Sequence, residues 1–92
     1  MIQTFGSEET ERIFFHERVK KFEAFERIAL RKLNMLHAAV SVMDLQIPPG
    51  NKLEKLQGKR SNLYSIRIND QWRICFIWKD GNAYEVQIED YH

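Results

Sequence analysis

Two arginines and a histidine near the C-terminus are the residues of this 92-residue chain that could do chemistry. Arg67 and Arg73 flank a short polar break between two runs of alternating apolar and polar residues, and His92 ends the chain. Guanidinium groups on neighbouring strands would present two rigid forks of donors, which bind a phosphate and stabilise charge that develops on it. Histidine transfers protons near neutral pH. These groups fit metal-free RNA cleavage, in which the 2′-hydroxyl attacks the adjacent phosphorus and an acid protonates the leaving oxygen.

Each of these side chains also has a structural alternative. Arg67 and Arg73 would serve stability alone if each paired with a local acid such as Glu89 or Asp90. His92 would do nothing if it were a frayed last residue, as many chain ends are. The residue types alone do not decide between these interpretations.

The histidines do not predict a metal site. His16, His37 and His92 lie far apart, with no cysteine or carboxylate at ligand spacing. The sequence also lacks a phosphate-binding loop, a glycine-rich dinucleotide turn and a nucleophile elbow. We therefore expect neither a metal nor a cofactor, and we expect His16 and His37 to be partly buried or surface residues of helices.

The arginines must be positioned by the last third of the chain, residues 63–92. Period-two alternation with many β-branched and aromatic residues predicts three strands joined by hairpins. A three-residue loop over 69–71 pairs Arg67 with Arg73 and keeps both guanidinium groups off the apolar face. That face would carry Tyr64, Ile66, Ile68, Trp72, Ile74 and Phe76. Trp72 is therefore more typical of a core than of a platform for a nucleobase.

The second hairpin is predicted from Asp80-Gly81, which favours a two-residue type I′ turn. Counting back from this turn opposes Ile77 to Tyr84 and Arg73 to Ile88. Positions 88, 90 and 92 then share the face of the two arginines. The same register puts three polar residues of the last strand on the apolar face, namely Glu85, Gln87 and Glu89.

The preceding residues predict a short strand and two helices. Residues 2–5 would form the strand, and a helix capped by Ser7 would run to about Arg18. A second helix, from about Glu23 to Val42, has an apolar stripe at helical spacing. The stripe is Phe25, Ala29, Leu33, Leu36 and Val40, with Arg27, Arg31 and Lys32 facing outward. Residues 48–51, Pro-Pro-Gly-Asn, predict a loop. The order β-α-α-β-β-β indicates an α+β domain with two N-terminal helices on a small, mostly antiparallel sheet.

Composition predicts one domain over residues 1–92, with 43% hydrophobic and 29% charged residues and a mean hydropathy of −0.50. No apolar run approaches the ~18 residues of a membrane span, and the start does not predict a signal peptide. The single cysteine, Cys75, cannot form an internal disulfide and fits a reducing compartment. We expect a cytoplasmic protein without a membrane partner.

Charge is segregated although the net charge is only +1. Residues 51–73 carry six basic residues against two acidic ones, Glu54 and Asp70. Such a stretch could form a basic patch for an RNA backbone. An ordinary solvated surface is the alternative. The basic residues are Lys52, Lys55, Lys59, Arg60, Arg67 and Arg73.

Three motifs in this sequence closely resemble the HigB toxins of the RelE-like superfamily. They are Pro-Pro-Gly-Asn-Lys-Leu-Glu-Lys-Leu-Gln-Gly-Lys-Arg over 48–60, Tyr-Ser-Ile-Arg-Ile-Asn-Asp-Gln-Trp-Arg-Ile-Cys-Phe over 64–76, and the terminal Glu-Asp-Tyr-His. The likeness extends to Arg-Lys-Leu-Asn-Met-Leu over 31–36 and so covers nearly the whole chain. It implies a RelE-like fold and a toxin of a type II toxin–antitoxin system.

The resemblance also implies a reaction and partners. Such a toxin cleaves mRNA in the ribosomal A site, stops translation, and is neutralised by a helix-turn-helix antitoxin, HigA. Operator DNA would be bound only through that antitoxin. By position, Arg73 matches the family's catalytic arginine and His92 its terminal histidine, with Tyr91 beside it. Arg67 would assist Arg73, and Lys52, Lys55, Lys59, Arg60 and Asn69 would contact RNA.

The sequence departs from the pattern of some members in two ways. A loop histidine is replaced by Glu54, and a loop lysine by Gln57. Another active-site arginine aligns with Asn69, whereas here the nearby arginine is Arg67. Glu54 is therefore a candidate general base. Two other functions remain open: a non-catalytic module that binds the ribosome or the antitoxin, and a co-repressor that acts only with its antitoxin.

Overall fold

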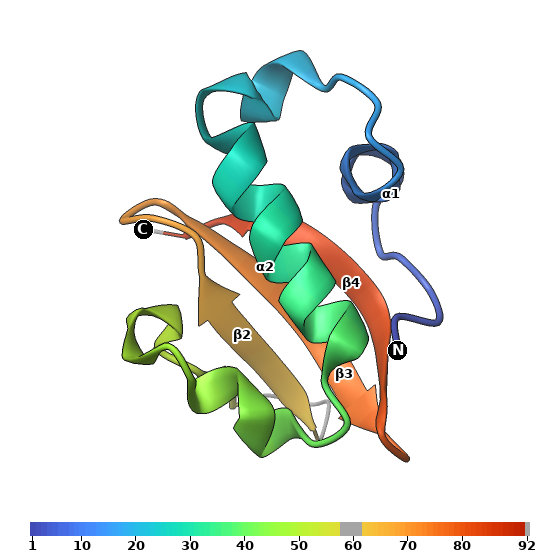
Figure 1. The fold of residues 1–92 in the computed structure, drawn as a ribbon, viewed down its shortest axis with the longest axis vertical. Coiled ribbons are helices and arrows are strands. Elements are labelled where there is room, and N and C mark those ends of the chain that lie inside the picture. Colours follow the sequence, from blue (N-terminus) through green and yellow to red (C-terminus); the bar gives the residue numbers. More distant parts are fainter. Residues whose placement is uncertain (58–61, 92) are drawn as a thin grey trace.

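The computed structural model describes residues 1–57 and 62–91, which form helices packed on an antiparallel sheet (Figure 1). The α-helices are α1 (Glu8–Phe14) and α2 (Glu26–Ala38), and the 3₁₀ helices are η1 (Lys20–Phe25), η2 (Val42–Gln46) and η3 (Pro49–Asn51). The strands, β1 (Glu54–Lys55), β2 (Leu63–Arg67), β3 (Trp72–Lys79) and β4 (Asn82–Asp90), lie in that order across the sheet. The predicted α+β fold is confirmed.

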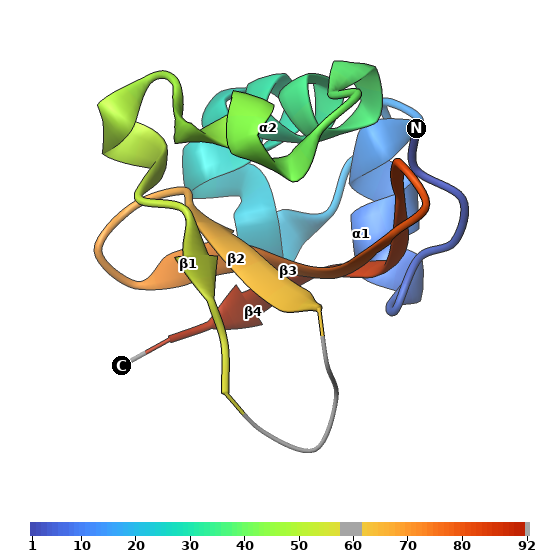
Figure 2. The same ribbon diagram turned by 90° about the horizontal axis from the view of Figure 1, so that it is seen from below.

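Both α-helices lie on one face of the sheet (Figure 2). They cover the apolar face of the strands, where Ile66, Ile74 and Phe76 are fully buried. Trp72 packs edge-on against Phe22, with ring centroids 5.6 Å apart, which confirms its interpretation as a core residue. In the described part of the chain no helix lies on the opposite face of the sheet, which is called the open face below.

The helix predictions were right in kind and too long in extent. The first helix ends at Phe14 rather than Arg18, and His16 follows it with a left-handed φ of 66°, so this histidine is not on a helix. The second is a 3₁₀ helix followed by α2, and the chain leaves α2 at Ala39. Val40 is consequently 81% exposed.

Two further expectations for this region were wrong. Lys32, expected to face solvent, is buried because its ammonium group reaches a buried polar partner described below. Residues 48–51 were expected to be loop, and they include the short helix η3 because Pro49 occupies its first turn, where the missing N–H costs nothing. None of the helices in the described part of the chain combines the length and apolarity that crossing a membrane requires.

The first hairpin has the predicted register. Arg67 pairs with Arg73 and Ile66 with Ile74, so the loop comprises residues 68–72 with Ile68 and Trp72 at its base. Ile68 is linked to Trp72 by a backbone hydrogen bond of 2.9 Å. Both arginines therefore lie on the open face.

The second hairpin has the predicted turn but a different register beyond it. Asp80 and Gly81 both have positive φ, as a type I′ turn requires, and Ile77 pairs with Tyr84. A β-bulge between Cys75 and Ile77 then shifts the register by one residue, so that Arg73 pairs with Glu89 and not with Ile88. The expectation that Ile88 and Asp90 share the arginine face is therefore wrong.

The bulge also removes polar residues from the apolar face, where the register predicted from the sequence had placed them. Glu85 takes a left-handed φ of 51° and absorbs the extra residue. Val86 and Ile88 then turn into the core, while Gln87 and Glu89 turn to the open face. Burial of apolar side chains favours this register over the uninterrupted one.

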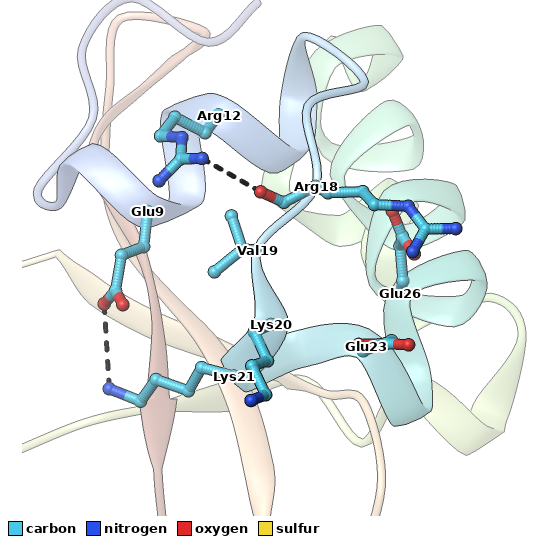
Figure 3. Close-up of a pocket in the computed structure, with 8 residues that line it drawn as sticks. All are labelled: Glu9, Arg12, Arg18, Val19, Lys20, Lys21, Glu23 and Glu26. Carbon is cyan, nitrogen blue, oxygen red and sulfur yellow. Dashed lines mark hydrogen bonds and ion pairs between the residues drawn. The ribbon is translucent and has the colours of Figure 1, made fainter.

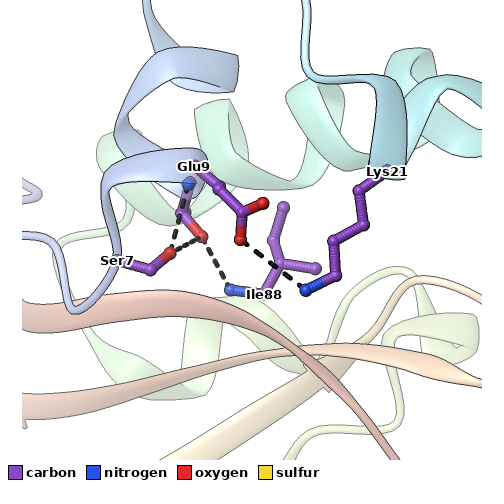
Figure 4. A network of polar contacts seen from close by, with 5 residues as sticks. Ser7, Glu9, Lys21 and Ile88 are labelled. Carbon is purple, nitrogen blue, oxygen red and sulfur yellow. Dashed lines mark hydrogen bonds and ion pairs between the residues drawn. The ribbon is translucent and has the colours of Figure 1, made fainter.

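The N-terminal segment lies along β4. Ile2 and Phe5 form isolated parallel bridges to Ala83 and Val86 instead of the predicted strand. Farther on, the hydroxyl of Thr10 accepts a hydrogen bond from the Ile88 N–H at 2.9 Å, and Ser7 donates to the same hydroxyl at 2.7 Å (Figure 4). These contacts fix α1 against the C-terminal half of β4.

Candidate functional site

The open face of the sheet brings together the polar residues of three strands. Strand alternation and the observed registers place Ser65 and Arg67 of β2, Arg73 and Cys75 of β3, and Gln87 and Glu89 of β4 on it. A cavity of about 350 Å³ lies on this face. It is lined by Leu63, Cys75, Ile77, Glu85, Gln87 and Glu89.

Arg73 is the most firmly held of the candidate residues. Its side chain is 7% exposed, and its Nε donates to Ser65 Oγ at 2.8 Å. Nη2 donates to the Lys52 carbonyl at 2.7 Å and to the Ser65 carbonyl at 3.3 Å. Within the described part of the chain, Nη1 makes no hydrogen bond. A guanidinium held in this way has one orientation and two remaining donors at one end.

Tyr91 lies beside Arg73. The guanidinium carbon of Arg73 is 5.7 Å from the centre of the Tyr91 ring, within range of a cation–π contact. Tyr91 is 44% exposed, and its N–H donates to the Gln71 carbonyl at 2.5 Å, which ties the chain end to the first hairpin. The ring is therefore accessible next to a fixed cation.

Arg67 lies opposite Arg73 across the strand pair and forms an ion pair with Asp70. Of the two sequence interpretations, pairing with a local acid is thus realised for Arg67, with an acid of its own hairpin rather than with Glu89 or Asp90. The Asp70 side chain is fully in solvent, so this pair contributes little to stability and the carboxylate is readily displaced.

Asn69 has a structural role that the sequence did not reveal. Its Oδ1 accepts hydrogen bonds from the backbone N–H groups of Gln71 at 2.9 Å and Trp72 at 2.8 Å. This is the pattern by which Asn shapes a turn. The amide oxygen is therefore committed to the hairpin, and only the amide nitrogen could contact a ligand.

The basic candidates on the segment before β2 are only partly described. Lys52 and Lys55 are exposed, and Lys52 comes close to Arg73 through its own carbonyl. Glu54 pairs with Ser65 in the register of β1 and β2, so it lies at the edge of the open face. Lys59, Arg60 and His92 lie outside the described residues.

Alternation puts Ser65 on the same strand face as Arg67, and its hydroxyl accepts from Arg73. Glu89, named from the sequence as an acid that could pair with an arginine, lies opposite Arg73 because of the bulge. It raises the pKa of the Cys75 thiol together with burial, which is the larger cause, and that pKa reaches about 12.

A larger cavity, of about 620 Å³, lies between α1 and η1 (Figure 3). Charges of both signs line it: Lys21 lies 3.6 Å from Glu9, and Arg12 donates to the Arg18 carbonyl at 2.9 Å. None of the candidate residues lines it. Across residues 1–57 and 62–91, no three His, Cys, Asp or Glu side chains are placed to hold a metal ion.

Comparison with known proteins identifies the family. A family model described as the RelE-like toxin of the type II toxin–antitoxin system HigB matches residues 4–92. Toxin HigB-1 of Vibrio cholerae is 42% identical over 66 residues, which are 72% of this chain and 70% of that protein. Endoribonuclease HigB of Proteus vulgaris is 44% identical over 41 residues, which are 45% of this chain and 45% of that protein.

Solved structures share the fold at lower sequence identity. The YoeB dimer from Staphylococcus aureus has a TM-score of 0.55 at 20% identity, and the match covers 99% of this chain and 97% of that one. A YoeB–YefM complex from the same organism has the same score and identity, with 100% and 98% covered. The family match over nearly the whole sequence agrees with the motifs that first indicated it. This chain belongs to the HigB family, the RelE-like toxins of type II toxin–antitoxin systems.

Proposed function

We propose that this toxin is an endoribonuclease that cleaves mRNA on the ribosome by attack of a 2′-hydroxyl on the adjacent phosphate, without a metal ion. The observation that carries the proposal is the fixed guanidinium of Arg73 on the open face. Its geometry suits a group that stabilises a phosphorane, because preorganised cations need no rearrangement as charge develops. The name of the Proteus vulgaris relative, an endoribonuclease, supports the same reaction.

The other candidate residues take roles around Arg73. Arg67 lies across the strand pair and would add a second cation once phosphate displaces Asp70. Tyr91 is exposed beside the guanidinium and would orient the substrate, while His92 would transfer the proton as acid or base. Lys52, Lys55, Lys59, Arg60 and Asn69 would bind the RNA backbone.

Membership of a toxin–antitoxin family gives this chain an antitoxin as its partner. We propose that this antitoxin is a HigA-like helix-turn-helix protein, that operator DNA is bound only through it, and that the ribosome and its mRNA are the targets. A protein that covers the open face would block access to Arg73. Neutralisation by the antitoxin would then follow from occlusion of the cation that the reaction needs.

The test is cleavage of a defined mRNA by the purified protein with and without ribosomes. Arg73→Lys and Arg73→Ala are expected to lose about 10²–10³-fold in rate, since one preorganised donor group contributes that much. His92→Ala is expected to lose about 10²–10⁴-fold, as for a general acid or base. Arg27→Ala, an exposed arginine on the helix side, is the matched control and should cleave normally.

Arg73 is buried, so each variant must first show a cooperative thermal transition. Arg73→Lys keeps a cation at the site and separates loss of the guanidinium from loss of the fold. Normal cleavage by folded Arg73→Lys would contradict the role given to Arg73. Absence of cleavage by the wild type, with ribosome binding intact, would instead establish a non-catalytic binding module.

A further inference from the structure

A buried lysine connects the helix layer to the segment that holds Arg73. Lys32 lies on α2, is 6% exposed, and its Nζ donates to Asn51 Oδ1 at 2.5 Å. Burying an ammonium group costs free energy unless the group is hydrogen-bonded, so the burial of Lys32 needs an explanation. Burial lowers the pKa of Lys32, and the nearby charges of Arg31 on the same helix and of Arg67 lower it further.

Asn51 is fully buried and anchors the segment between η2 and β1. Its Nδ2 donates to the carbonyls of Leu45 at 3.1 Å and Ile47 at 3.5 Å, and its N–H donates to the Pro48 carbonyl at 2.9 Å. Together with the bond from Lys32, these contacts engage the donors and the acceptor of this side chain. Asn51 is consequently a rigid point in a stretch of chain with little regular structure.

The next residue, Lys52, connects this fixed segment to Arg73 through a hydrogen bond. Lys52 has a left-handed backbone, with φ 45° and ψ 57°, and its N–H donates to the Pro49 carbonyl at 3.0 Å. This unusual conformation aims the Lys52 carbonyl at Nη2 of Arg73, 2.7 Å away. The other hydrogen-bond acceptors of Arg73 belong to Ser65 on the neighbouring strand β2. The Lys52 carbonyl is thus an acceptor that does not belong to a strand of the sheet. A left-handed non-glycine residue is sparsely populated and must be held by its surroundings.

We propose that Lys32 and Asn51 are positioning residues, which fix the Lys52 carbonyl and so orient the Arg73 guanidinium toward the substrate. The inference deepens the proposed function and rests on it for the effect on catalysis. It accounts for a buried cation at position 32, which packing alone does not explain. It also links helix α2, which lies on the helix-covered face of the sheet, to a site on the open face (Figure 1).

The kinetic test compares Lys32→Met with Lys32→Gln. Methionine fills a similar volume but cannot donate, whereas a glutamine amide can still donate to Asn51. We expect Lys32→Met to lower kcat about 10- to 100-fold, because misplacement of a catalytic group by about 1 Å has effects of this size. KM should change less than about twofold, and Lys32→Gln should recover part of kcat. Arg31→Met removes an exposed cation from the same helix and should leave kcat unchanged.

A double variant distinguishes positioning from a general loss of structure. In an Arg73→Lys background no guanidinium remains to be oriented, so adding Lys32→Met should lower the residual rate less than about twofold. Equal losses in both backgrounds would overturn the inference, since a damaged fold lowers the rate whatever residue occupies position 73.

A measurement without substrate separates this inference from the proposed reaction. Nuclear magnetic resonance of the full chain with ¹⁵N-labelled arginine should show resolved Nη signals for Arg73, because the bond to Lys52 hinders rotation of the guanidinium. In Lys32→Met these signals should merge, and in Arg31→Met they should persist. Unchanged signals in folded Lys32→Met would overturn the inference even if the wild type cleaves mRNA. Failure of the wild type to cleave would overturn the proposed function but not this result.

Discussion

Cys75 shows how closely the chemistry of one side chain depends on its neighbours on the open face. The thiol is 3% exposed, and its pKa is raised to about 12 by burial first, then by the hydrogen bond and charge of Glu89. The positive charge of Arg73 acts in the opposite direction and is outweighed. A thiol with this pKa carries almost no thiolate at neutral pH, so Cys75 is not a nucleophile even though it lines the cavity.

The raised pKa of Cys75 predicts a loss of stability at alkaline pH. Below pH 9 the thiol is protonated in both the folded and the unfolded chain and contributes nothing. Between pH 9 and about 12 the unfolded thiol ionises and the folded one does not, so the free energy of unfolding falls. At pH 10 the fall should be on the order of 1 kcal/mol. Urea unfolding at pH 8 and pH 10 should show this fall in the wild type.

The matched variant for this measurement is Cys75→Ala. It should lose less stability between the two pH values than the wild type does. Lys32, whose lowered pKa makes stability rise with pH, is present in both proteins and cancels in the comparison. Equal losses in both proteins would mean that the Cys75 thiol ionises as readily in the folded chain as in the unfolded one.

At the scale of secondary-structure elements, the sequence predicted the features that neighbouring residues determine. Asp80-Gly81 specified its turn, and the need to keep Arg67 and Arg73 out of the core specified the first register. The bulge at Glu85 was indicated only by the polar residues that the uninterrupted register puts on the apolar face, and the residues that contact it lie about 80 positions away. The Glu85 N–H donates to Thr4 Oγ1 at 2.8 Å, and a Cβ on Gly6 would lie 2.8 Å from the Glu85 carbonyl.

The candidate site, like the strands, could be predicted only where neighbouring residues determine it. The pairing of Arg67 with Arg73 followed from alternation, whereas Tyr91 contacts Arg73 after a bulge that shifts the predicted register by one residue. The acceptors of Arg73 did not follow, because the Lys52 carbonyl arrives through a left-handed residue in a loop. No periodicity marks such a residue. A buried Lys32 was unexpected for the same reason, since its partner Asn51 is 19 residues away.

Thr10 provides a test of how α1 is fixed to the sheet. Thr10→Val keeps the shape but removes the oxygen that accepts from the Ile88 N–H, leaving a buried donor unpaired. The expected loss is about 1–3 kcal/mol in the free energy of unfolding, measured by urea titration. Thr10→Ser keeps the hydroxyl and should lose less. A Thr10→Val protein as stable as the wild type would show that another group satisfies Ile88.

At the scale of the whole molecule, charge is distributed more unevenly than the net value of +1 suggests. Lys52 and Lys55 are exposed on the segment that carries the Lys52 carbonyl to Arg73. Acidic residues are concentrated in the first 26 and the last 13 residues of the chain. A protein with this distribution would approach an RNA surface with the segment around Lys52 foremost, because the phosphate backbone attracts the cations there.

This orientation predicts a change in the salt dependence of ribosome binding. When cationic side chains contact phosphates, they release counterions, and the logarithm of the binding constant falls with the logarithm of salt by about 0.7–0.9 per contact. Replacing Lys52 and Lys55 by glutamine keeps the Lys52 carbonyl and removes two such contacts. The slope should become shallower by about 1.4–1.8. Binding measured at several salt concentrations with non-cleavable mRNA on the ribosome gives this slope directly.

The control is a second pair of exposed cations on the helix side of the sheet, Arg27→Gln with Arg31→Gln. It changes the net charge by the same amount as the Lys52 and Lys55 replacements. If steering by net charge alone governed binding, the two double variants would lose affinity equally. A shallower slope confined to the Lys52 and Lys55 variant would place the phosphate contacts on the segment around Lys52, whereas equal slopes in all three proteins would mean that these lysines do not touch RNA.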